Sequence, residues 1–281
     1  MNCEWDQYLR ILPLWMREEV NRAGKDKLLE LRLRLNLPPE MVFSEGSRYL
    51  KRMTQQQDLN NCINAATGYS PWASETVSRG YITVPGGHRI GICGTYINTK
   101  QSNQILRPSM LCLRVARDFP GIAKSAATTA ESTLILGRPG SGKTTLLRDL
   151  IRQYGSSNNG SIAVVDEREE LFPRAQDNLC FSPGTHTDVL SGCGKLRGIE
   201  MVLRSMTPAF IAVDEITAKE DCEALLHAGW CGVRLLATAH ATDTYDLRKR
   251  PIYRPLIESN LFQRFLIMKP DKTWYMERSA V

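Results

Sequence analysis

The 281 residues are enough for one large domain or two moderate ones, and a hydrophobic content of 42% with 23% charged residues is ordinary for a soluble globular protein. No apolar run approaches the ~18 residues of a membrane-spanning helix, and the first residues lack the basic and then apolar layout of a signal peptide. The eight cysteines include no Cys-x-x-Cys pair, the spacing typical of structural zinc sites. The net charge of +6 lies entirely in residues 1–125, where 17 Lys and Arg face 11 Asp and Glu; this indicates either a solvated basic face or a surface for an anionic partner such as nucleic acid, lipid or nucleotide phosphates. The chain is therefore expected to be cytoplasmic, with any membrane contact peripheral.

Residues 1–125 are expected to form a small α+β domain. Leucines alternate with charged residues over residues 29–35, which is the period of a half-buried strand. The Thr-x-x-Gln pattern at residues 54–57 predicts the start of a helix. Residues 81–93 place a Pro-Gly-Gly turn between two apolar segments, as in a hairpin, and residues 110–116 predict another strand.

Residues 126–281 alternate between strand and helix patterns. Apolar runs predict strands at residues 132–136, 162–166, 210–214, 233–239 and 265–269. Helices are expected at residues 144–154, 195–206, 221–228 and 243–249, the third capped by Thr217 and Glu220 and ended by Gly229. This alternation predicts an α/β domain with a mostly parallel sheet covered on both faces, which binds ligands at the carboxyl ends of its strands.

Residues 137–144 match the pattern G-x-x-x-x-G-K-[ST], the P-loop that binds nucleotide phosphates. Its glycines let backbone N–H groups turn inward around a phosphate, and the helix that follows adds the positive end of its dipole. Lys143 is expected to reach the β- and γ-phosphates, and the Thr144 hydroxyl to bind Mg²⁺. The expected cofactors are ATP and Mg²⁺, held by Gly137, Arg138, Pro139, Gly140, Ser141, Gly142, Lys143, Thr144 and Thr145.

The strand predicted at residues 210–214 ends in two carboxylates. Asp214 is expected to bind the Mg²⁺ shell together with Thr144, the alternative being a helix cap. Glu215 is the candidate to orient or deprotonate the attacking water. Together with the P-loop, these residues predict a Mg²⁺-dependent ATPase.

Two other strand ends carry candidate catalytic residues. The run Asp166-Glu-Arg-Glu-Glu170 holds four carboxylates, one of which is expected to act as a second water-activating base while the others are solvated or paired with Arg168. His240 ends the fourth strand, where its imidazole is expected to sense hydrolysis; a purely structural histidine is the alternative.

In this order, the glycine loop, acidic run, Asp-Glu strand and terminal histidine resemble the secretion and pilus-motor ATPases, a RecA-like branch of P-loop proteins. A more specific pattern resembles the stage III sporulation protein AA family and extends over nearly the whole chain. It consists of Gly80–Gly91, Val165–Arg168, Thr187–Leu190, Arg204–Pro208, Val213–Ile216, Lys249–Pro251 and Arg254–Glu258.

The resemblance implies a cytoplasmic ATPase of the mother cell in endospore-forming bacteria. It would energise a channel complex across the two membranes around the forespore, with membrane proteins of that complex as partners. Related motors are hexameric rings in which the N-terminal domain packs on the neighbour's ATPase domain and supplies arginines to its nucleotide; Arg89 and Arg114 are the positions to test.

Carried over residue by residue, the resemblance places Glu170 at the catalytic glutamate of the acidic run, with Glu167 as competitor, and His240 in the histidine motif. Asp214 departs from the secretion motors, which often have glycine there, and the zinc element of some of them is absent. These departures bring the expected metal site closer to ordinary RecA-like enzymes.

Three functions fit the sequence. The first is an oligomeric ATPase motor of a trans-envelope assembly. The second is a nucleic-acid-dependent RecA-like ATPase. The basic N-terminal half favours this function, whereas the lack of an evident aromatic strip for base stacking argues against it. The third is a nucleotide-gated scaffold that binds ATP and barely hydrolyses it.

Overall fold

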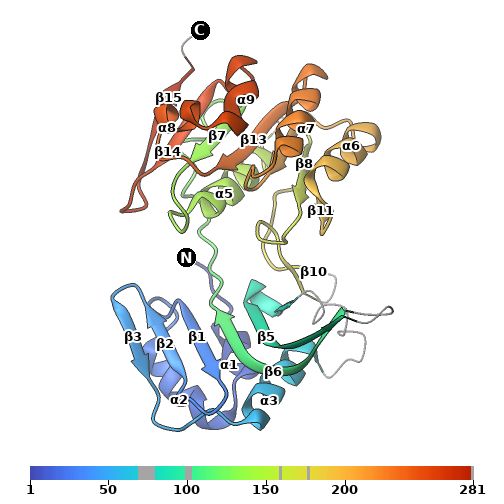
Figure 1. Ribbon diagram of the computed structural model, residues 1–281. Coiled ribbons are helices and arrows are strands. Elements are labelled where there is room, and N and C mark those ends of the chain that lie inside the picture. Colours follow the sequence, from blue (N-terminus) through green and yellow to red (C-terminus); the bar gives the residue numbers. More distant parts are fainter. Residues whose placement is uncertain (69–79, 99–102, 158–159, 176–177, 280–281) are drawn as a thin grey trace. The chain divides into compact units, whose positions relative to one another are not determined.

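The computed structural model describes residues 1–68, 80–98, 103–157, 160–175 and 178–279. By its internal contacts the chain divides into two compact units, Met1–Asp118 with Arg174–Phe181 and Phe119–Pro173 with Ser182–Val281 (Figure 1). In the described ranges, no helix combines the length and the apolar character needed to cross a membrane.

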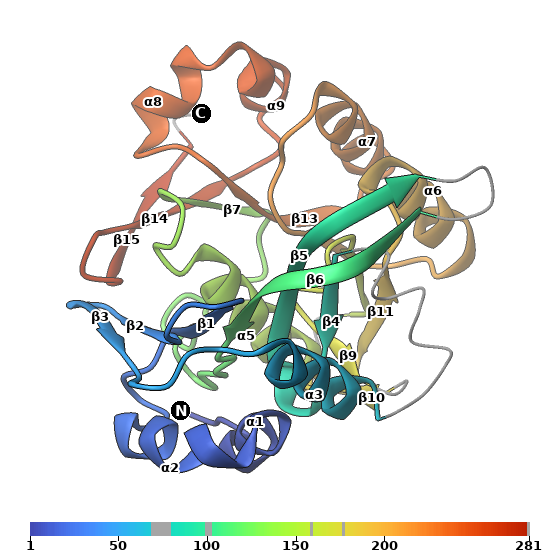
Figure 2. The ribbon, with the colours of Figure 1, turned by 60° about the horizontal axis from the view of Figure 1, so that its bottom comes forward.

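The first unit is a six-stranded antiparallel sheet with helices on one face. The strand order is β3-β2-β1-β6-β5-β4, and every neighbouring pair is antiparallel. Figure 2 shows the helices of this unit beside its sheet. Tyr8 and Met16 from the helices pack with Leu31 and Leu113 from the sheet in one buried core. The elements are α1 Trp5–Ile11, α2 Leu14–Ala23, β1 Glu30–Arg34, β2 Glu40–Phe43, β3 Gly46–Tyr49, α3 Gln56–Thr67, β4 Tyr81–Thr83, η2 Pro85–Gly87, β5 Arg89–Asn98 and β6 Asn103–Arg114.

The predicted strand at residues 29–35 and the hairpin at residues 81–93 are confirmed as β1 and as β4–β5. The strand predicted at residues 110–116 overlaps the second half of the longer β6. The predicted start of α3 is wrong by one residue. The N–H of Gln55 donates to the Asp58 carboxylate at 2.8 Å, so the cap lies one position after the Thr-x-x-Gln pattern.

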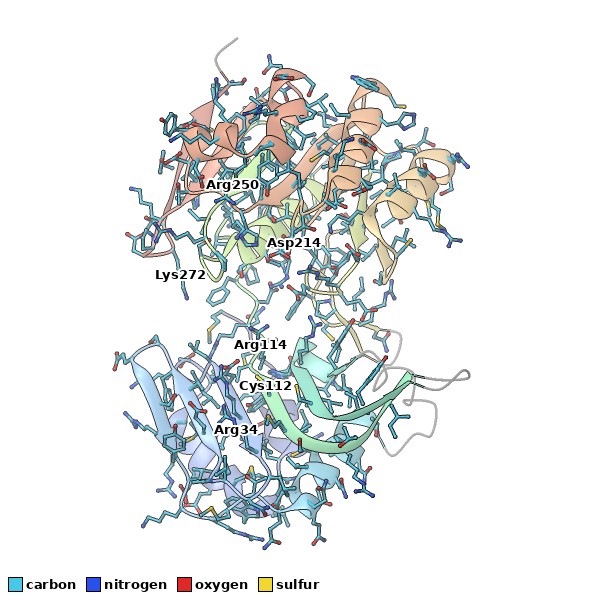
Figure 3. The ribbon with its side chains drawn as sticks, in the orientation of Figure 1. Arg34, Cys112, Arg114, Asp214, Arg250 and Lys272 are labelled. Atoms are coloured by element: carbon cyan, nitrogen blue, oxygen red, sulfur yellow. The ribbon has the colours of Figure 1, made fainter. Side chains whose placement is uncertain are left out.

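The face of the sheet opposite the helices carries arginines. Leu31 and Leu33 are fully buried on the helix side, so the intervening arginine of β1 points to the other side. Cross-strand pairing puts Arg114 and then Arg89 on that same face, and Figure 3 shows Arg114 there. We call Arg32, Arg34, Arg89 and Arg114 the arginine face; Glu30 and Glu40 lie among them and form ion pairs with Arg32 and Arg34.

His88 joins three segments of the first unit. Its Nε2–H donates to the carbonyl of Glu4 at 2.9 Å, and its Nδ1 accepts from the N–H of Ala116 at 3.0 Å. The ring is 1% exposed, and burial lowers the pKa of His88. Because both ring nitrogens are committed in the neutral tautomer, protonation would place a proton against the Ala116 N–H.

We therefore expect the chain to lose stability in mild acid through His88. The stabilisation is complete above the ordinary histidine pKa of about 6.5 and is lost as the pH falls from there through the lowered pKa of the folded state. The loss is about 1.4 kcal/mol for each unit of pKa lowering. Urea unfolding between pH 7.5 and 5 should show a weaker pH dependence in His88→Gln than in the unmodified chain; equal dependence in both would contradict this role.

A short hairpin from later in the chain completes the first unit. Its strands, β9 Arg174–Ala175 and β10 Asn178–Leu179, pair antiparallel. The Cys180 Sγ lies 3.9 Å from the carbonyl of Val84, and backbone N–H groups of the η2 turn face the same sulfur. The hairpin is therefore part of the first unit, although its flanking residues belong to the second.

The second unit has a seven-stranded sheet in the order β11-β8-β12-β13-β7-β14-β15. All neighbouring pairs are parallel except β14–β15, so the predicted mostly parallel sheet is confirmed. The elements are β7 Thr133–Leu136, α5 Lys143–Gly155, β8 Ile162–Asp166, β11 Thr187–Ser191, α6 Lys195–Ser205, β12 Phe210–Val213, α7 Lys219–Trp230, β13 Arg234–Ala239, α8 Thr244–Lys249, η3 Pro251–Tyr253, α9 Arg254–Glu258, β14 Arg264–Met268 and β15 Trp274–Arg278.

Helices cover both faces of this sheet. Ile211 and Val213 of β12 lie in one core with residues of α6, α7, α8 and α9. Phe210 points to the opposite face, where its ring lies 5.3 Å from that of Tyr154 on α5. The P-loop helix α5 thus packs on one face of the sheet, and α6, α7, α8 and α9 pack on the other.

The predicted ends of α7 need correction. Asp221, rather than Glu220, accepts from the N–H groups of Thr217 and Ala218 at 2.9 and 3.1 Å. The helix continues past Gly229 to Trp230. A Cβ at Gly229 would lie 2.4 Å from Leu261 Cδ2, so this glycine permits close packing instead of ending the helix.

Candidate active site

Four parallel strands bring the predicted motifs to one edge of the sheet. β8, β12, β13 and β7 are consecutive neighbours. The chain leaves their carboxyl ends into the acidic run, the Asp214-Glu215 pair, His240 and the P-loop respectively. Lys143 and His240, 97 positions apart in the sequence, therefore meet. Asp214 is labelled at this edge in Figure 3.

The P-loop has a backbone that requires its glycines. Gly140 and Gly142 have φ angles of 74° and 98°, in the left-handed region that favours glycine. A Cβ at Gly137 would lie 2.5 Å from Ser141 Oγ and 2.9 Å from Met268 Cβ. Ser141 Oγ is buried and, among the described residues, is one of only three buried side-chain polar atoms without a hydrogen-bond partner. The loop thus holds an unsatisfied polar atom, as expected of a site that closes around a polar ligand.

Lys143 is buried inside this loop. Its Nζ donates to the carbonyl of Arg138 at 3.0 Å and lies 3.2 Å from His240 Nδ1. Burial lowers the pKa of Lys143, whereas the charges of Asp214 and Glu215 act in the opposite direction. Since a charged ammonium only donates, His240 Nδ1 accepts from it, which leaves Nε2–H as the donor of the ring.

Asp214 is held from both sides by hydroxyl groups. Its Oδ2 accepts from Thr144 Oγ1 at 2.7 Å, and its Oδ1 accepts from Thr238 Oγ1 at 2.6 Å. The same Thr238 hydroxyl accepts from the N–H of Glu215 at 2.8 Å. Glu215 has a φ of 57°, a backbone conformation that costs energy in a non-glycine residue, and Thr238 stabilises it.

Glu215 is shared between two donors. His240 Nε2 donates to its Oε1 at 2.5 Å, and Arg168 forms an ion pair with its Oε2. Burial raises the pKa of Glu215, but the His240 hydrogen bond and the charges of Arg168 and Lys143 lower it further than burial raises it. Glu215 is therefore ionised at neutral pH, as a general base must be.

The loop that contains the acidic run is held by side-chain hydrogen bonds to its backbone. The Asp166 carboxylate is 2% exposed and accepts from the N–H groups of Glu170 and Phe172 at 2.9 and 2.8 Å; burial raises the pKa of Asp166 despite these bonds. Arg148 on α5 donates to the carbonyls of Leu171 and Glu170 at 2.6 and 2.8 Å. The loop backbone is thereby tied to the P-loop helix.

The two glutamates of this loop differ in their surroundings. Glu167 Oε2 lies 2.7 Å from Lys195 Nζ, which is 4% exposed and also lies 3.6 Å from Asp221. Glu170 lines a small pocket together with Glu167, Asp214 and Glu215. Both glutamates therefore line the pocket at the Asp-Glu pair, and Glu167 in addition has a buried cation as its partner.

The residues present fit ATP and Mg²⁺. The P-loop offers a glycine backbone and a buried lysine to phosphate, and the contact between Thr144 and Asp214 offers two oxygen ligands of the kind Mg²⁺ prefers. Arg89 and Arg114 belong to the first unit, where they are cross-strand neighbours on the arginine face.

The profile of the family described as "Sporulation stage III, protein AA" matches residues 4–275. The chain belongs to this family. The family's stage III sporulation protein AA of Bacillus subtilis (strain 168) is 33% identical over 281 aligned residues, which cover 95% of this chain and 92% of that protein.

Solved structures share the fold at low sequence identity. The Legionella pneumophila ATPase DotB is 17% identical with a TM-score of 0.55, covering 96% of this chain and 80% of DotB. The pilus retraction motor PilT with bound ADP is 16% identical with a TM-score of 0.60, covering 92% of this chain and 80% of PilT. The family member described here therefore has the P-loop fold of secretion and pilus-motor ATPases.

Sequence reasoning missed Thr238 and Lys195. Thr238 could have been recognised, because it lies in a run of buried apolar residues, Leu235–Ala239, where a hydroxyl needs a partner. Lys195 had none, since its partners Glu167 and Asp221 come together only in the folded chain.

We expect Thr238→Val, which keeps the shape but removes the hydroxyl, to raise the Mg²⁺ concentration needed for half-maximal ATP hydrolysis about tenfold or more. It leaves Asp214 Oδ1 and the Glu215 N–H without their partner, a loss of about 1–3 kcal/mol. Thr238→Ser should stay close to the unmodified chain. Thr133→Val, at another fully buried threonine of the sheet, is the matched control; an unchanged Mg²⁺ requirement in Thr238→Val would refute the role.

Proposed function

We propose that this chain is a Mg²⁺-dependent ATPase that works as a ring, most simply a hexamer, and drives a trans-envelope channel complex during endospore formation. The observation that carries the ATPase proposal is the chain of contacts from Lys143 through His240 to Glu215, beside the Thr144–Asp214 pair. It combines a phosphate-binding lysine, a metal-binding pair and an ionised carboxylate at one edge of the sheet.

The chemistry follows from these contacts. Lys143 would neutralise charge on the β- and γ-phosphates, and Thr144 with Asp214 would hold Mg²⁺, which polarises those phosphates when bound. Glu215 would orient or deprotonate the attacking water, and Glu170 would assist from the acidic loop. His240 touches both Lys143 and Glu215, so it is placed to transmit the state of the phosphate site to the base.

The wider role rests on the family and the fold. The name of the Bacillus subtilis relative places it in sporulation, and DotB and PilT are described as an ATPase and a retraction motor. By this analogy the chain would act in the mother cell, with a ring of its own copies and the membrane proteins of a channel complex as partners.

The arginine face supports one alternative, a nucleic-acid-dependent ATPase. A sheet surface with four arginines suits a phosphate backbone as well as a neighbour's nucleotide. Stimulation of ATP hydrolysis by single-stranded DNA, falling steeply with salt, would favour this alternative; the motor proposal expects no such stimulation.

The direct test is steady-state ATP hydrolysis with Mg²⁺ and with excess EDTA, on the unmodified chain and on Glu215→Gln. Hydrolysis should stop in EDTA. Glu215→Gln should bind ATP but lose at least ~10²-fold in rate, the usual contribution of a general base. Unimpaired turnover in Glu215→Gln would remove Glu215 from the mechanism.

Glu170→Gln and Glu167→Gln assign the second carboxylate. We expect Glu170→Gln to lose rate and Glu167→Gln to affect mainly stability, since Glu167 neutralises the buried Lys195. A slow Glu167→Gln beside an unimpaired Glu170→Gln would transfer the role to Glu167.

A further inference from the structure

Arg168 is the exposed cation of the pocket at the strand ends. The pocket is lined by Asp166, Glu167, Arg168, Glu170, Lys195, Asp214 and Glu215, so five carboxylates face two cations. Lys195 is 4% exposed and lies between Glu167 and Asp221. Arg168 is 54% exposed, and its ion pair is with Glu215. Of the two cations, Arg168 is the one free to change its position.

A series of side-chain contacts connects Arg168 to the lysine of the P-loop. Lys143 contacts His240, His240 contacts one oxygen of Glu215, and Arg168 contacts the other oxygen. In P-loop enzymes the lysine of the loop reaches the β- and γ-phosphates. The guanidinium is thus three side-chain contacts from the group that would hold the terminal phosphate.

In this arrangement Glu215 is not free to act on water. Both of its oxygens accept from charged or polar donors, and each hydrogen bond lowers the basicity that proton transfer requires. A terminal phosphate carries more negative charge than a carboxylate, and its oxygens match the planar fork of a guanidinium. Bound ATP would therefore compete with Glu215 for Arg168.

We propose that Arg168 is a phosphate-sensing residue that leaves Glu215 for the terminal phosphate of ATP. The single exchange would release the general base and bring a positive charge to the γ-phosphate from within the same chain. The inference rests on the proposed ATPase function and deepens it.

The backbone around Arg168 favours a side-chain movement over a loop movement. Asp166 accepts from two amides of the loop, and Arg148 donates to two of its carbonyls. The long side chain of Arg168 can therefore change its rotamer while the loop backbone stays in place. Arg148 is 7% exposed and committed to these carbonyls, so it is not a substitute for Arg168.

Nucleotide affinity tests the exchange without relying on turnover. The Kd values of the full chain for ADP and for the non-hydrolysable analogue AMP-PNP are measured with Mg²⁺, for the unmodified chain, Arg168→Gln and Arg168→Lys. Arg168→Gln should weaken AMP-PNP binding about tenfold or more, as expected for a charge-assisted hydrogen bond, and change ADP binding less than about twofold. Arg168→Lys should recover part of the difference. Arg197→Gln, an exposed arginine on α6, is the matched control.

A double-mutant cycle tests whether Glu215 is the partner of Arg168 before ATP binds. Glu215→Gln removes the charge that holds Arg168, so it should tighten AMP-PNP binding more in the unmodified background than in Arg168→Gln. Equal effects in both backgrounds, or an unchanged ratio of AMP-PNP to ADP affinity in Arg168→Gln, would overturn the proposal. Failure of the unmodified chain to bind or hydrolyse ATP would instead refute the proposed function, so the two failures are distinguishable.

Discussion

Replacing Lys143 by alanine is expected to abolish measurable ATP hydrolysis and to weaken ATP binding. The Nζ of Lys143 carries the positive charge enclosed by the P-loop. Its contacts with the Arg138 carbonyl and His240 Nδ1 hold it at the carboxyl ends of the strands. Without it, the loop loses the charge that neutralises the β- and γ-phosphates, and His240 loses the donor that fixes its tautomer. Both binding and the alignment of Glu215 should suffer.

Turnover and ATP affinity of Lys143→Ala are measured beside Lys219→Ala. Lys219 is 79% exposed at the start of α7, so its loss removes the same charge without touching the site. Circular dichroism and thermal unfolding check that both variants are folded. Normal turnover in Lys143→Ala would exclude the P-loop as the ATP site.

Arg89→Ala or Arg114→Ala is expected to lower the hydrolysis rate by about 10³-fold or more and to change ATP binding much less. An arginine supplied by a neighbouring subunit is worth about 10³–10⁵ in rate in P-loop enzymes. The two residues are cross-strand neighbours; Arg114 is 67% exposed with Glu30 at 3.6 Å, and Arg89 lies 3.7 Å above the Tyr81 ring. A pair of cross-strand arginines on one face of the sheet is suited to a phosphate of another copy.

Two measurements separate supply by a neighbour from supply within one chain. Turnover per subunit should rise with protein concentration, and mixing either arginine variant with Lys143→Ala should restore activity, since one copy offers the site and the other the arginine. Arg48→Ala is the control, because Arg48 is an exposed arginine of the same sheet that lies over the Phe43 ring. Turnover independent of concentration, together with no rescue on mixing, would mean that the enzyme works as a monomer.

The central strands were predictable because burial on both faces makes them continuous apolar runs. The prediction for β8 at residues 162–166 is confirmed to the residue. Those for β7, β12 and β13 differ by one residue at one end, and that for β14 is shifted by one residue. β11 and β15 escaped prediction because they are edge strands with polar or exposed side chains, for example Asp188 and Glu277. At an edge, strand formation depends on the neighbour and not on an apolar pattern.

The site was predictable as far as strand ends and motifs determine it. The structure brings together Lys143, Thr144, Asp214, Glu215 and His240, as expected from adjacent parallel strands. The partner of each charge was not predictable. The sequence suggested that Arg168 pairs within the acidic run, yet its ion pair is with a residue 47 positions later, because strand order and loop bracing decide which charges meet.

Because the β9–β10 hairpin belongs to the first unit but follows part of the second in the sequence, no single cut in the gene separates the two units. The chain crosses between them at residues 118–119, 173–174 and 181–182, and the middle crossing directly follows the loop that carries Glu170. A truncation after Asp118 would leave the η2 turn without the hairpin that packs on it, and the remaining fragment would carry that hairpin without its support. Recombination between relatives at residue 118 would exchange one half of the packed pair formed by the η2 turn and the hairpin, so these two segments must diverge together.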